Sequence, residues 1–151
     1  MKREKLIKRI VLEAFSHATE SEERVVEALK NLTGNEDLEP SSKQVVHGYH
    51  GNPIVVFRYE AEGEEAQREA ARIFSSLDDF DAAELARSIE ARLSRGKMFF
   101  RLDKQDAYLG EVRLSEGDDV VRVTVTFYPH IRGREKVLWA LKRLGLRNEE
   151  T

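Results

Sequence analysis

The sequence has no cysteine, and among its 151 residues it has only three prolines and two methionines. Without cysteine there are no disulfides, no zinc sites built on thiolates and no cysteine nucleophile. No apolar run approaches the roughly 20 residues of a membrane-spanning helix, and no apolar segment of the signal-peptide type follows the basic residues 2–9. We therefore expect a cytoplasmic protein that does not associate with membranes.

Charge is distributed unevenly along the chain. Charged residues make up 35 % of the sequence and the net charge is −3, yet residues 1–9 and 131–147 together hold 11 basic and two acidic residues. The remainder is strongly acidic. Because the termini of a domain often lie close together, the two basic ends can form one cationic surface. The alternative is that they are ordinary solvated helix faces.

Apolar residues follow the periods of both strands and helices, which predicts an α+β fold. Strands are expected over residues 10–18, 43–60 with a break at 48–53, 97–102, 108–114 and 121–128. Helices are expected over residues 20–33, 64–77, 82–94 and 133–144. The order β-α-β-β-α-α-β-β-β-α does not alternate strictly, which disfavours a doubly wound parallel sheet. We expect a sandwich whose mostly antiparallel or mixed sheet carries its helices on one face.

Polar residues and glycines indicate where elements begin and end. Thr19, with Glu22 three residues later, has the pattern of a capping box. Asp81 is positioned to cap the start of the helix over 82–94, and Gly96 is expected in the C′ position, just after the end of that helix. The chain is expected to form one domain over residues 1–151, with residues 1–9 as a basic extension and residues 147–151 as a frayed tail.

Several short segments combine polar, aromatic and glycine residues in a way that a plain core segment does not. They are His17-Ala18-Thr19-Glu20, residues 47–54, residues 101–105, residues 107–110 and Gly117-Asp118-Asp119. With these motifs in order over residues 10–145, the chain resembles an archaeal family of predicted exosome-associated RNA-binding proteins. The resemblance implies a compact α+β fold similar to that of the ribosomal protein that binds 5S rRNA. It also implies RNA binding and a link to RNA processing, to RNA degradation by the exosome or to the ribosome.

The residues themselves also indicate RNA binding. Basic side chains neutralise phosphates, and aromatic rings stack on unpaired bases. If the sheet brings the polar segments to one edge, the contact surface consists of Arg101, Lys104, Gln105, His50, Tyr49 and His17. The basic residues Arg132, Arg134 and Lys136 would add nonspecific attraction to phosphates. Each residue also has an ordinary structural explanation, such as a cross-strand ion pair or a packed aromatic in a turn.

Two alternatives remain open. Asp103, Asp118 and Asp119 belong to a group of five carboxylates within 17 residues, the ligand type of a metal-dependent nuclease, although neighbouring residues of a strand point to opposite faces. The acidic body could instead dock a basic protein, which would make the chain an adaptor or scaffold. Walker loops, dinucleotide fingerprints and nucleophile elbows are missing. We therefore expect a non-catalytic RNA-binding protein without cofactor or metal.

Overall fold

One antiparallel sheet runs through the centre of the molecule. The computed structural model describes residues 4–17, 20–47 and 51–147. Within these ranges six strands pair in the order β2-β3-β1-β6-β5-β4, each neighbouring pair antiparallel. The strands are β1 (Ile7–His17), β2 (Ser42–His47), β3 (Pro53–Glu62), β4 (Leu93–Ser94), β5 (Lys97–Asp103) and β6 (Val120–Phe127). The helices are α1 (Glu22–Thr33), α2 (Gly63–Ser76), α3 (Asp79–Arg87), α4 (Ile89–Arg92), α5 (Lys104–Tyr108) and α6 (Gly133–Arg143).

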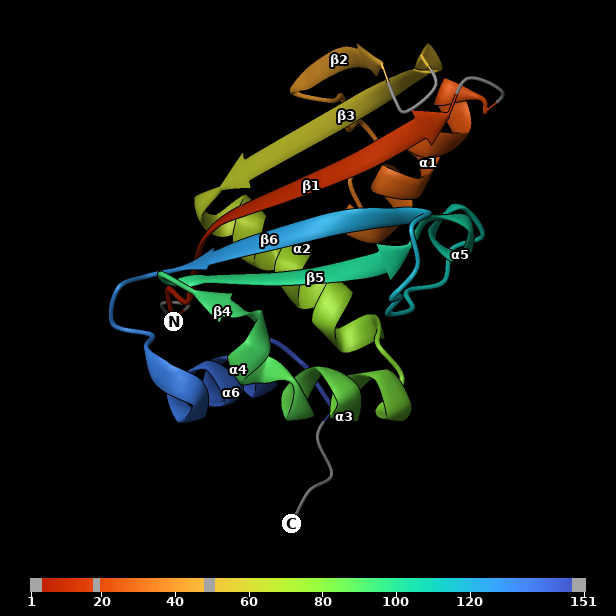
Figure 1. Ribbon diagram of the computed structural model, residues 1–151. Helices are drawn as coiled ribbons and strands as arrows, with labels where there is room; N and C mark the ends of the chain where they lie inside the picture. Colours follow the sequence, from red (N-terminus) through yellow and green to blue (C-terminus); the bar gives the residue numbers. More distant parts are fainter. Residues whose placement is uncertain (1–3, 18–19, 48–50, 148–151) are drawn as a thin grey trace.

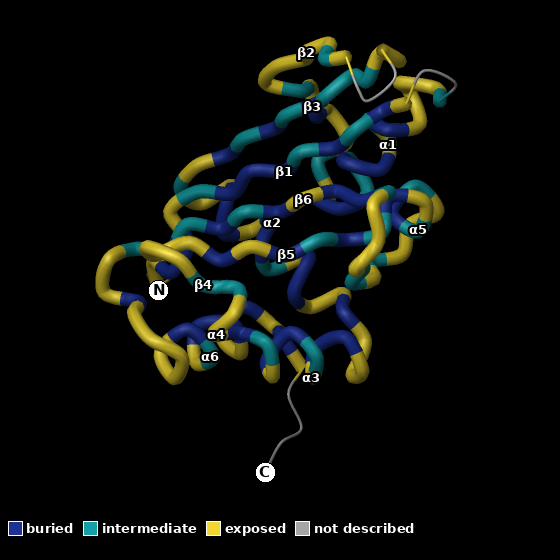
Figure 2. Tube along the Cα trace, in the orientation of Figure 1, coloured by how far each residue is buried: buried dark blue, intermediate teal, exposed yellow. Residues whose placement is uncertain are grey.

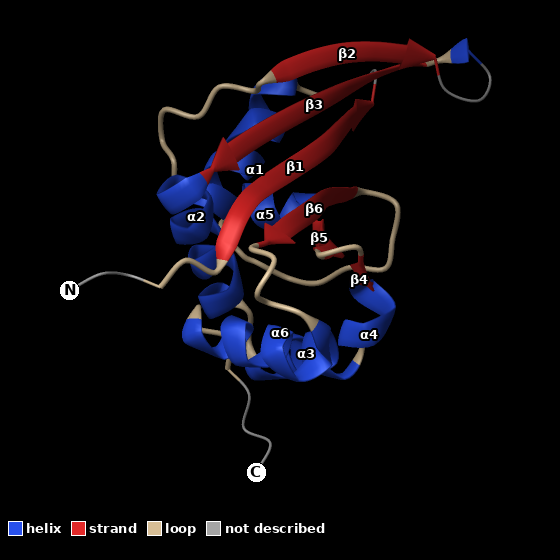
Figure 3. Ribbon diagram, turned by 90° about the vertical axis from the view of Figure 1, so that its left-hand side faces the viewer, coloured by secondary structure: helices blue, strands red, loops and turns tan. Residues whose placement is uncertain are grey.

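The arrangement of layers confirms the α+β class expected from the periodicity. Helices α1 and α2 lie on one face of the sheet, and α3, α4 and α6 gather beyond its β4 edge (Figures 1 and 3). The opposite face of the sheet has no helix over it in the described ranges (Figure 1). None of the described helices combines the length and the apolar composition needed to span a bilayer.

Alternation along the strands separates the core from the open face. On β1, Ile10, Leu12 and Ala14 are fully buried, while Glu13 and Phe15 are only half-buried and belong to the other face. Strands β3, β5 and β6 alternate in the same way (Figure 2). The helical residues that the periodicity predicts to be buried are buried: Val25, Ala28, Leu29, Leu32, Ala66, Ala70, Ile73, Phe74 and Leu77.

Two helix N-termini differ from the expected ones. α1 has Ser21 in the N-cap position, and the predicted cap, Thr19, lies outside the described residues. At α3 the carboxylate of Asp78 accepts the capping hydrogen bond, from the backbone amide of Asp81 (2.8 Å). The prediction that Asp81 is the cap is wrong. Its own Oδ2 accepts a hydrogen bond from the amide of Leu114 (2.9 Å) and so ties α3 to a distant loop.

The helix expected to reach Ser94 ends at Arg92. Leu93 and Ser94 instead form β4, which pairs with the start of β5. Between the two strands, Arg95 and Gly96 have φ angles of 52° and 79°. Positive φ at both central residues matches the twist of a two-residue hairpin turn. Gly96 therefore closes a hairpin and does not end a helix.

The strand expected over residues 108–114 does not form. The carboxylate of Asp103 accepts a hydrogen bond from the amide of Asp106 (2.8 Å), which starts the short helix α5 at the end of β5. The loop after α5 meets β5 again at an isolated bridge between Leu102 and Leu114. Leu114 packs against the core from this loop. The alternation of this segment therefore reflects a loop lying on the core and not a ladder-paired strand.

Both ends of the chain are attached to the helical layer. Oε1 of Gln67, on α2, accepts hydrogen bonds from the amides of Leu6 (2.7 Å) and Ile7 (3.0 Å), and its Nε2 donates one to the carbonyl of Glu4 (2.6 Å). The carboxylate of Glu4 also pairs with Arg143 of α6. The N-terminal and C-terminal basic segments therefore lie near each other, as the termini of domains often do.

A buried carboxyl group lies between α2 and β3. Glu69 is 1 % exposed, and its two oxygens lie 3.0 and 2.8 Å from the hydroxyl of Tyr59. Burial disfavours the charged carboxylate more than the hydrogen bond from Tyr59 favours it, and the pKa of Glu69 rises to about 7. Burial likewise raises the pKa of Tyr59. The fold thus holds an acid that titrates near neutral pH.

We expect the protein to lose stability as the pH rises from 5 to 8. The pKa of Glu69 is about 7 when folded and about 4.3 for an unperturbed Glu, so the folded state retains the proton over a wider range. The stabilisation is complete below the unfolded pKa and disappears as the pH passes the folded pKa. Its size is on the order of 1–3 kcal/mol.

Chemical denaturation of the wild type, Glu69→Gln and Glu64→Gln at pH 5 and pH 8 measures this effect. Glu69→Gln cannot titrate at this position and should lose most of the pH dependence. Glu64→Gln removes an exposed carboxyl group of the same helix and should keep it. The same pH dependence in all three proteins would contradict the assignment.

Candidate functional site

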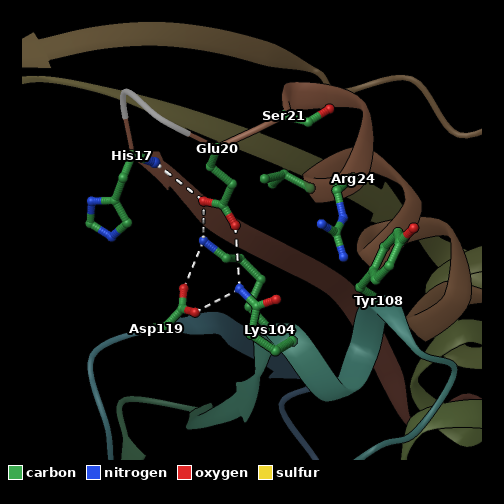
Figure 4. A pocket seen from close by; sticks show the side chains of 9 residues that line it. His17, Glu20, Ser21, Arg24, Lys104, Tyr108 and Asp119 are labelled. Carbon is green, nitrogen blue, oxygen red and sulfur yellow. Dashed lines mark hydrogen bonds and ion pairs between the residues drawn. The ribbon is translucent and has the colours of Figure 1, made fainter.

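A pocket of about 460 Å³ opens at one end of the sheet, where segments far apart in the sequence converge. Because β1 and β5 are both antiparallel to β6, the ends of β1 and β5 meet the beginning of β6 there. The starts of α1 and α5 complete the walls (Figure 4). The lining residues are His17, Glu20, Ser21, Arg24, Val25, Lys104, Gln105, Tyr108 and Asp119.

The side chain of Lys104 lies at the centre of this site. Lys104 is 2 % exposed, and its Nζ lies 2.7 Å from Oε1 of Glu20 and 2.7 Å from Oδ1 of Asp119. The ammonium also donates a hydrogen bond to the carbonyl of Phe15 on β1. Taking an ammonium out of water is costly unless it is paired, and here two carboxylates pair with it. The two ion pairs (Figure 4) and this hydrogen bond therefore connect α5 with β1, with the segment before α1 and with the residue before β6.

The two carboxylates are held in turn by neighbouring groups. Nε2 of Gln105 donates to Oδ2 of Asp119 (2.8 Å) and lies 3.4 Å from Oε2 of Glu20. The backbone amide of His17 donates to Oε1 of Glu20 (3.2 Å). Burial opposes the ionisation of Asp119, but hydrogen bonds from Lys104 and Gln105 outweigh it and hold the pKa of Asp119 below its ordinary value. Asp119 therefore keeps its negative charge at neutral pH.

The α1–α5 wall of the pocket carries a cation on an aromatic ring. The guanidinium carbon of Arg24 lies 4.2 Å from the centre of the Tyr108 ring, and the exposed Arg24 side chain points into the pocket (Figure 4). Asn31 fixes this wall, because its Nδ2 donates to the carbonyls of Ala107 (3.0 Å) and Tyr108 (3.1 Å). A positive group and a flat ring are thus presented together by two helices.

The structure brings several of the predicted RNA contacts to this end of the sheet. His17, Lys104 and Gln105 line the same pocket. Arg101 lies nearby on β5, where its guanidinium is 3.3 Å from Oε2 of Glu116. Lys104 differs from the others, because its charge is already used by Glu20 and Asp119, and a direct phosphate contact would require this cluster to open. The contact roles of these residues stay predictions.

The predicted contacts Tyr49 and His50 lie outside the described residues. They lie between β2, which ends at His47, and β3, which begins at Pro53, and these two residues pair with each other. The next residue of β3, Ile54, pairs with the pocket residue His17.

The C-terminal basic residues lie in a different part of the molecule. Arg132, Arg134 and Lys136 are at the start of α6, which follows the end of β6 that points away from the pocket. Arg134 lies 3.7 Å from a carboxylate oxygen of Glu90, and the ammonium of Lys136 lies 3.9 Å from the centre of the Trp139 ring. These residues form a second basic region, which we call the α6 region.

Sequence reasoning did not name Glu20, Arg24, Tyr108 or Asp119 as RNA contacts, and it offered Asp119 only as a carboxylate of the nuclease alternative. Glu20 belongs to one of the short polar motifs, but it precedes α1 and therefore shares no helix face with Arg24. Nothing in the pattern indicates the role of Tyr108, because the alternation around it predicts a strand. Asp119 is hidden among acidic residues that look like a solvated turn.

The carboxylates suggested for a nuclease have structural roles. Asp103 caps α5, Asp119 pairs with Lys104, and Asp118 is exposed in the loop before β6. In the part of the chain that the structure describes, no three His, Asp or Glu side chains are grouped so that they could hold a metal ion. The arrangement therefore gives no support to the nuclease alternative.

An open antiparallel sheet backed by helices, with a pocket at its end that presents an exposed guanidinium on an aromatic ring, is suited to a nucleic-acid-binding protein. A family model described as RNA binding matches residues 9–127. The chain therefore belongs to this family of RNA-binding proteins. The part of the sequence expectation that concerned the RNA-binding family is thus confirmed.

Relatives from archaea agree with this assignment. An RNA-binding protein of Pyrococcus abyssi is 34 % identical over 139 residues, which are 88 % of this chain and 90 % of that protein. An uncharacterized protein of Methanocaldococcus jannaschii is 37 % identical over 127 residues, 81 % of this chain and 85 % of that protein. The crystal structure of a DUF54-family protein from Archaeoglobus fulgidus matches with a TM-score of 0.74 and 28 % identity, covering 91 % of this chain and 99 % of that one. That structure has the same fold.

We expect Lys104→Met to lower the free energy of unfolding by roughly 1–3 kcal/mol, because it keeps the aliphatic stem but leaves Glu20 and Asp119 without their cation. The loss should stay below the roughly 3–5 kcal/mol of a fully buried pair, because the side chain of Asp119 is 43 % exposed. Urea denaturation measures the change. Adding Asp119→Asn to Lys104→Met should recover part of the loss, and equal stability of Lys104→Met and the wild type would contradict the assignment.

Proposed function

We propose that this protein binds RNA without cleaving it and acts in RNA processing or degradation, for example at the exosome, or in a ribosome-related task. Family membership and the relative named an RNA-binding protein support RNA as the partner. The exosome and ribosome part of the proposal rests on the resemblance of the short motifs. The structural roles of Asp103 and Asp119 favour binding over cleavage.

The observation that carries the proposal is the Arg24–Tyr108 pair in the pocket. The ring supports the guanidinium at 4.2 Å, so the charge is positioned while Arg24 remains exposed. A guanidinium can form two hydrogen bonds to one phosphate, and the edge of the ring offers apolar surface to a base or ribose. In this proposal Lys104 holds the walls of the pocket together through its ion pairs, and Arg24 contacts the phosphate.

Arg101 supplies a second cation close to the pocket. Its side chain is 39 % exposed, and its contact with Glu116 (3.3 Å) is long for a charge-assisted hydrogen bond. Glu116 is itself 75 % exposed and is shared with Arg92 (3.4 Å). Exposed ion pairs of this kind contribute little stability, so a phosphate can replace Glu116 at small cost.

The α6 region has a different part in this proposal. It lies away from the pocket, and its three cations add long-range attraction to a polyanion. Contacts with phosphates alone carry no sequence information. We therefore expect the α6 region to strengthen binding to any RNA, while the pocket determines the orientation of the bound strand.

RNA affinity measured at two salt concentrations with EDTA present tests this function. We expect binding that tolerates EDTA, because it needs no metal, and that weakens steeply with salt, because cations are released from the phosphates. A structured and an unstructured RNA should be compared. Absence of salt-dependent binding to both would contradict the proposal and favour a protein-docking role for the acidic body.

Neutralising the two assigned phosphate contacts should reduce the salt dependence by a predictable amount. The slope of log K against log salt should become shallower by about 0.7–0.9 per contact, so by roughly 1.5 for Arg24→Gln combined with Arg101→Gln. Arg87→Gln is the matched control, since Arg87 is 70 % exposed on α3 and pairs only with its helix neighbour Glu84 among the described residues. An unchanged slope in the double variant would remove Arg24 and Arg101 from the site.

A further inference from the structure

The face of the sheet opposite α1 and α2 presents a regular array of side chains to solvent. Residues that are register partners in an antiparallel sheet lie side by side on the same face. One such row crosses β5, β6, β1 and β3 and consists of Arg101, Arg122, Glu13 and Arg58. The next row along β5 contains Phe99, opposite Thr124 of β6. No described helix lies in front of these strands (Figure 1).

Phe99 has no role in the core. It is 44 % exposed, while its neighbours on β5, Met98 and Phe100, are 0 % and 3 % exposed and point into the core. An aromatic ring on the solvent side of a strand leaves apolar area in water. Such a ring on an open sheet is a stacking surface for an unpaired base.

A second ring lies across β6 on the same face. Phe15 on β1 is half-buried, and the guanidinium carbon of Arg122 on β6 lies 5.0 Å from the centre of its ring. The register places Phe15 beyond the Arg101–Arg122–Glu13 row and Phe99 on the other side of that row, so the two rings are two strands apart across the sheet and four residues apart along it. The exposed Arg122 lies in the row between them, where it can reach a phosphate of a strand that crosses this face.

The charge of this face is uneven. Toward the β3 side, Arg9 and Arg58 are paired with Glu60 at 2.6 and 2.7 Å. On the β5–β6 half, the one outward carboxylate of the strands, that of Asp103, is occupied by capping α5, and Glu116 of the adjoining loop is shared between Arg101 and Arg92. The outward cations of that half are Lys97, Arg101 and Arg122. The cationic half of the face is therefore the half that carries Phe99.

We infer that the β5–β6 half of the open face binds an unpaired stretch of RNA, with a base stacked on Phe99 and flanking phosphates on Arg101 and Arg122. This inference rests on the proposed function and specifies its substrate as single-stranded. A duplex does not fit the arrangement, because its bases are stacked on each other and its major groove is too narrow to admit side chains from a sheet. The pocket at the strand ends then receives the continuation of the same strand.

Substitution of Phe99 separates stacking from phosphate contact. Phe99→Ala should weaken binding of a short unpaired RNA about tenfold, the effect of losing one base–aromatic stack. Binding of a duplex of the same length, and the dependence of affinity on salt, should not change. The matched control is Phe80→Ala, which removes a ring that is 74 % exposed on α3 and should leave both affinities unchanged.

A fluorescence measurement reports the contact directly. The chain has one tryptophan, Trp139 on α6, so the F99W, W139F double variant carries its single indole on the sheet face. We expect this variant to bind unpaired RNA as the wild type does, since an indole also stacks, and its emission to be quenched on binding. The W139F protein with Phe99 retained has no indole and is the control for any change in emission that does not come from position 99.

The outcomes distinguish the inference from the function on which it rests. If the wild type binds neither RNA, the proposed function and the inference both fail. If it binds RNA but Phe99→Ala leaves the affinity unchanged, or lowers it equally for unpaired and duplex RNA, the inference fails and the proposed function stands. A change in sedimentation on Phe99→Ala without a change in RNA affinity would assign the face to a second copy of the chain and also overturn the inference.

Discussion

The ion pairs of Lys104 are the interaction on which the arrangement of the site depends. Strand pairing already places the ends of β1 and β5 beside the start of β6. The ion pairs, with the hydrogen bond from Lys104 to the carbonyl of Phe15, add the segment before α1 to this group and so fix α1 relative to α5. A buried ammonium without a paired carboxylate would be costly, so Lys104 requires the pairing that Glu20 and Asp119 provide. The pocket and its Arg24–Tyr108 wall are built around that requirement.

The same cluster determines which charges remain for a ligand. The chain is acidic overall, with a net charge of −3, yet carboxylates near the site are occupied: Asp119 by Lys104, and Asp103 by the amide that starts α5. The guanidinium of Arg24 lies over the Tyr108 ring, and that of Arg101 has long contacts with the exposed Glu116 (3.3 Å) and with the carbonyl of Gly117 (3.4 Å). An acidic protein can in this way present a locally cationic surface to a polyanion, because the local field depends on which groups are paired and not on the total charge.

Sequence reasoning predicts the fold better than the site. The alternation in β6 and the apolar spacing in α1 and α2 give the correct elements. Burying one face of a strand or helix requires apolar residues at the period of that element. Sequence reasoning fails where a polar side chain has a partner that is distant in the sequence. Asp81 looks like a helix cap but binds the amide of Leu114, and the alternation at 108–114 comes from a loop held on the core. Lys104 looks like a free cation for the same reason, because its partners are 84 and 15 residues away.

The pocket and the open face meet along β5, which gives the two regions one geometry. Asp103 ends β5 and caps α5, and the turn made there places the side chain of Lys104 in the cluster. Arg101, two residues before Asp103, stays on the open face. Phe99 is two residues earlier again and lies on the same face. In the inference drawn above, a strand of RNA that follows β5 passes a stacking ring, then a guanidinium, then the pocket with Arg24. The ring and the cations then have different parts, because phosphate contacts position a strand while stacking on a ring requires an unpaired base.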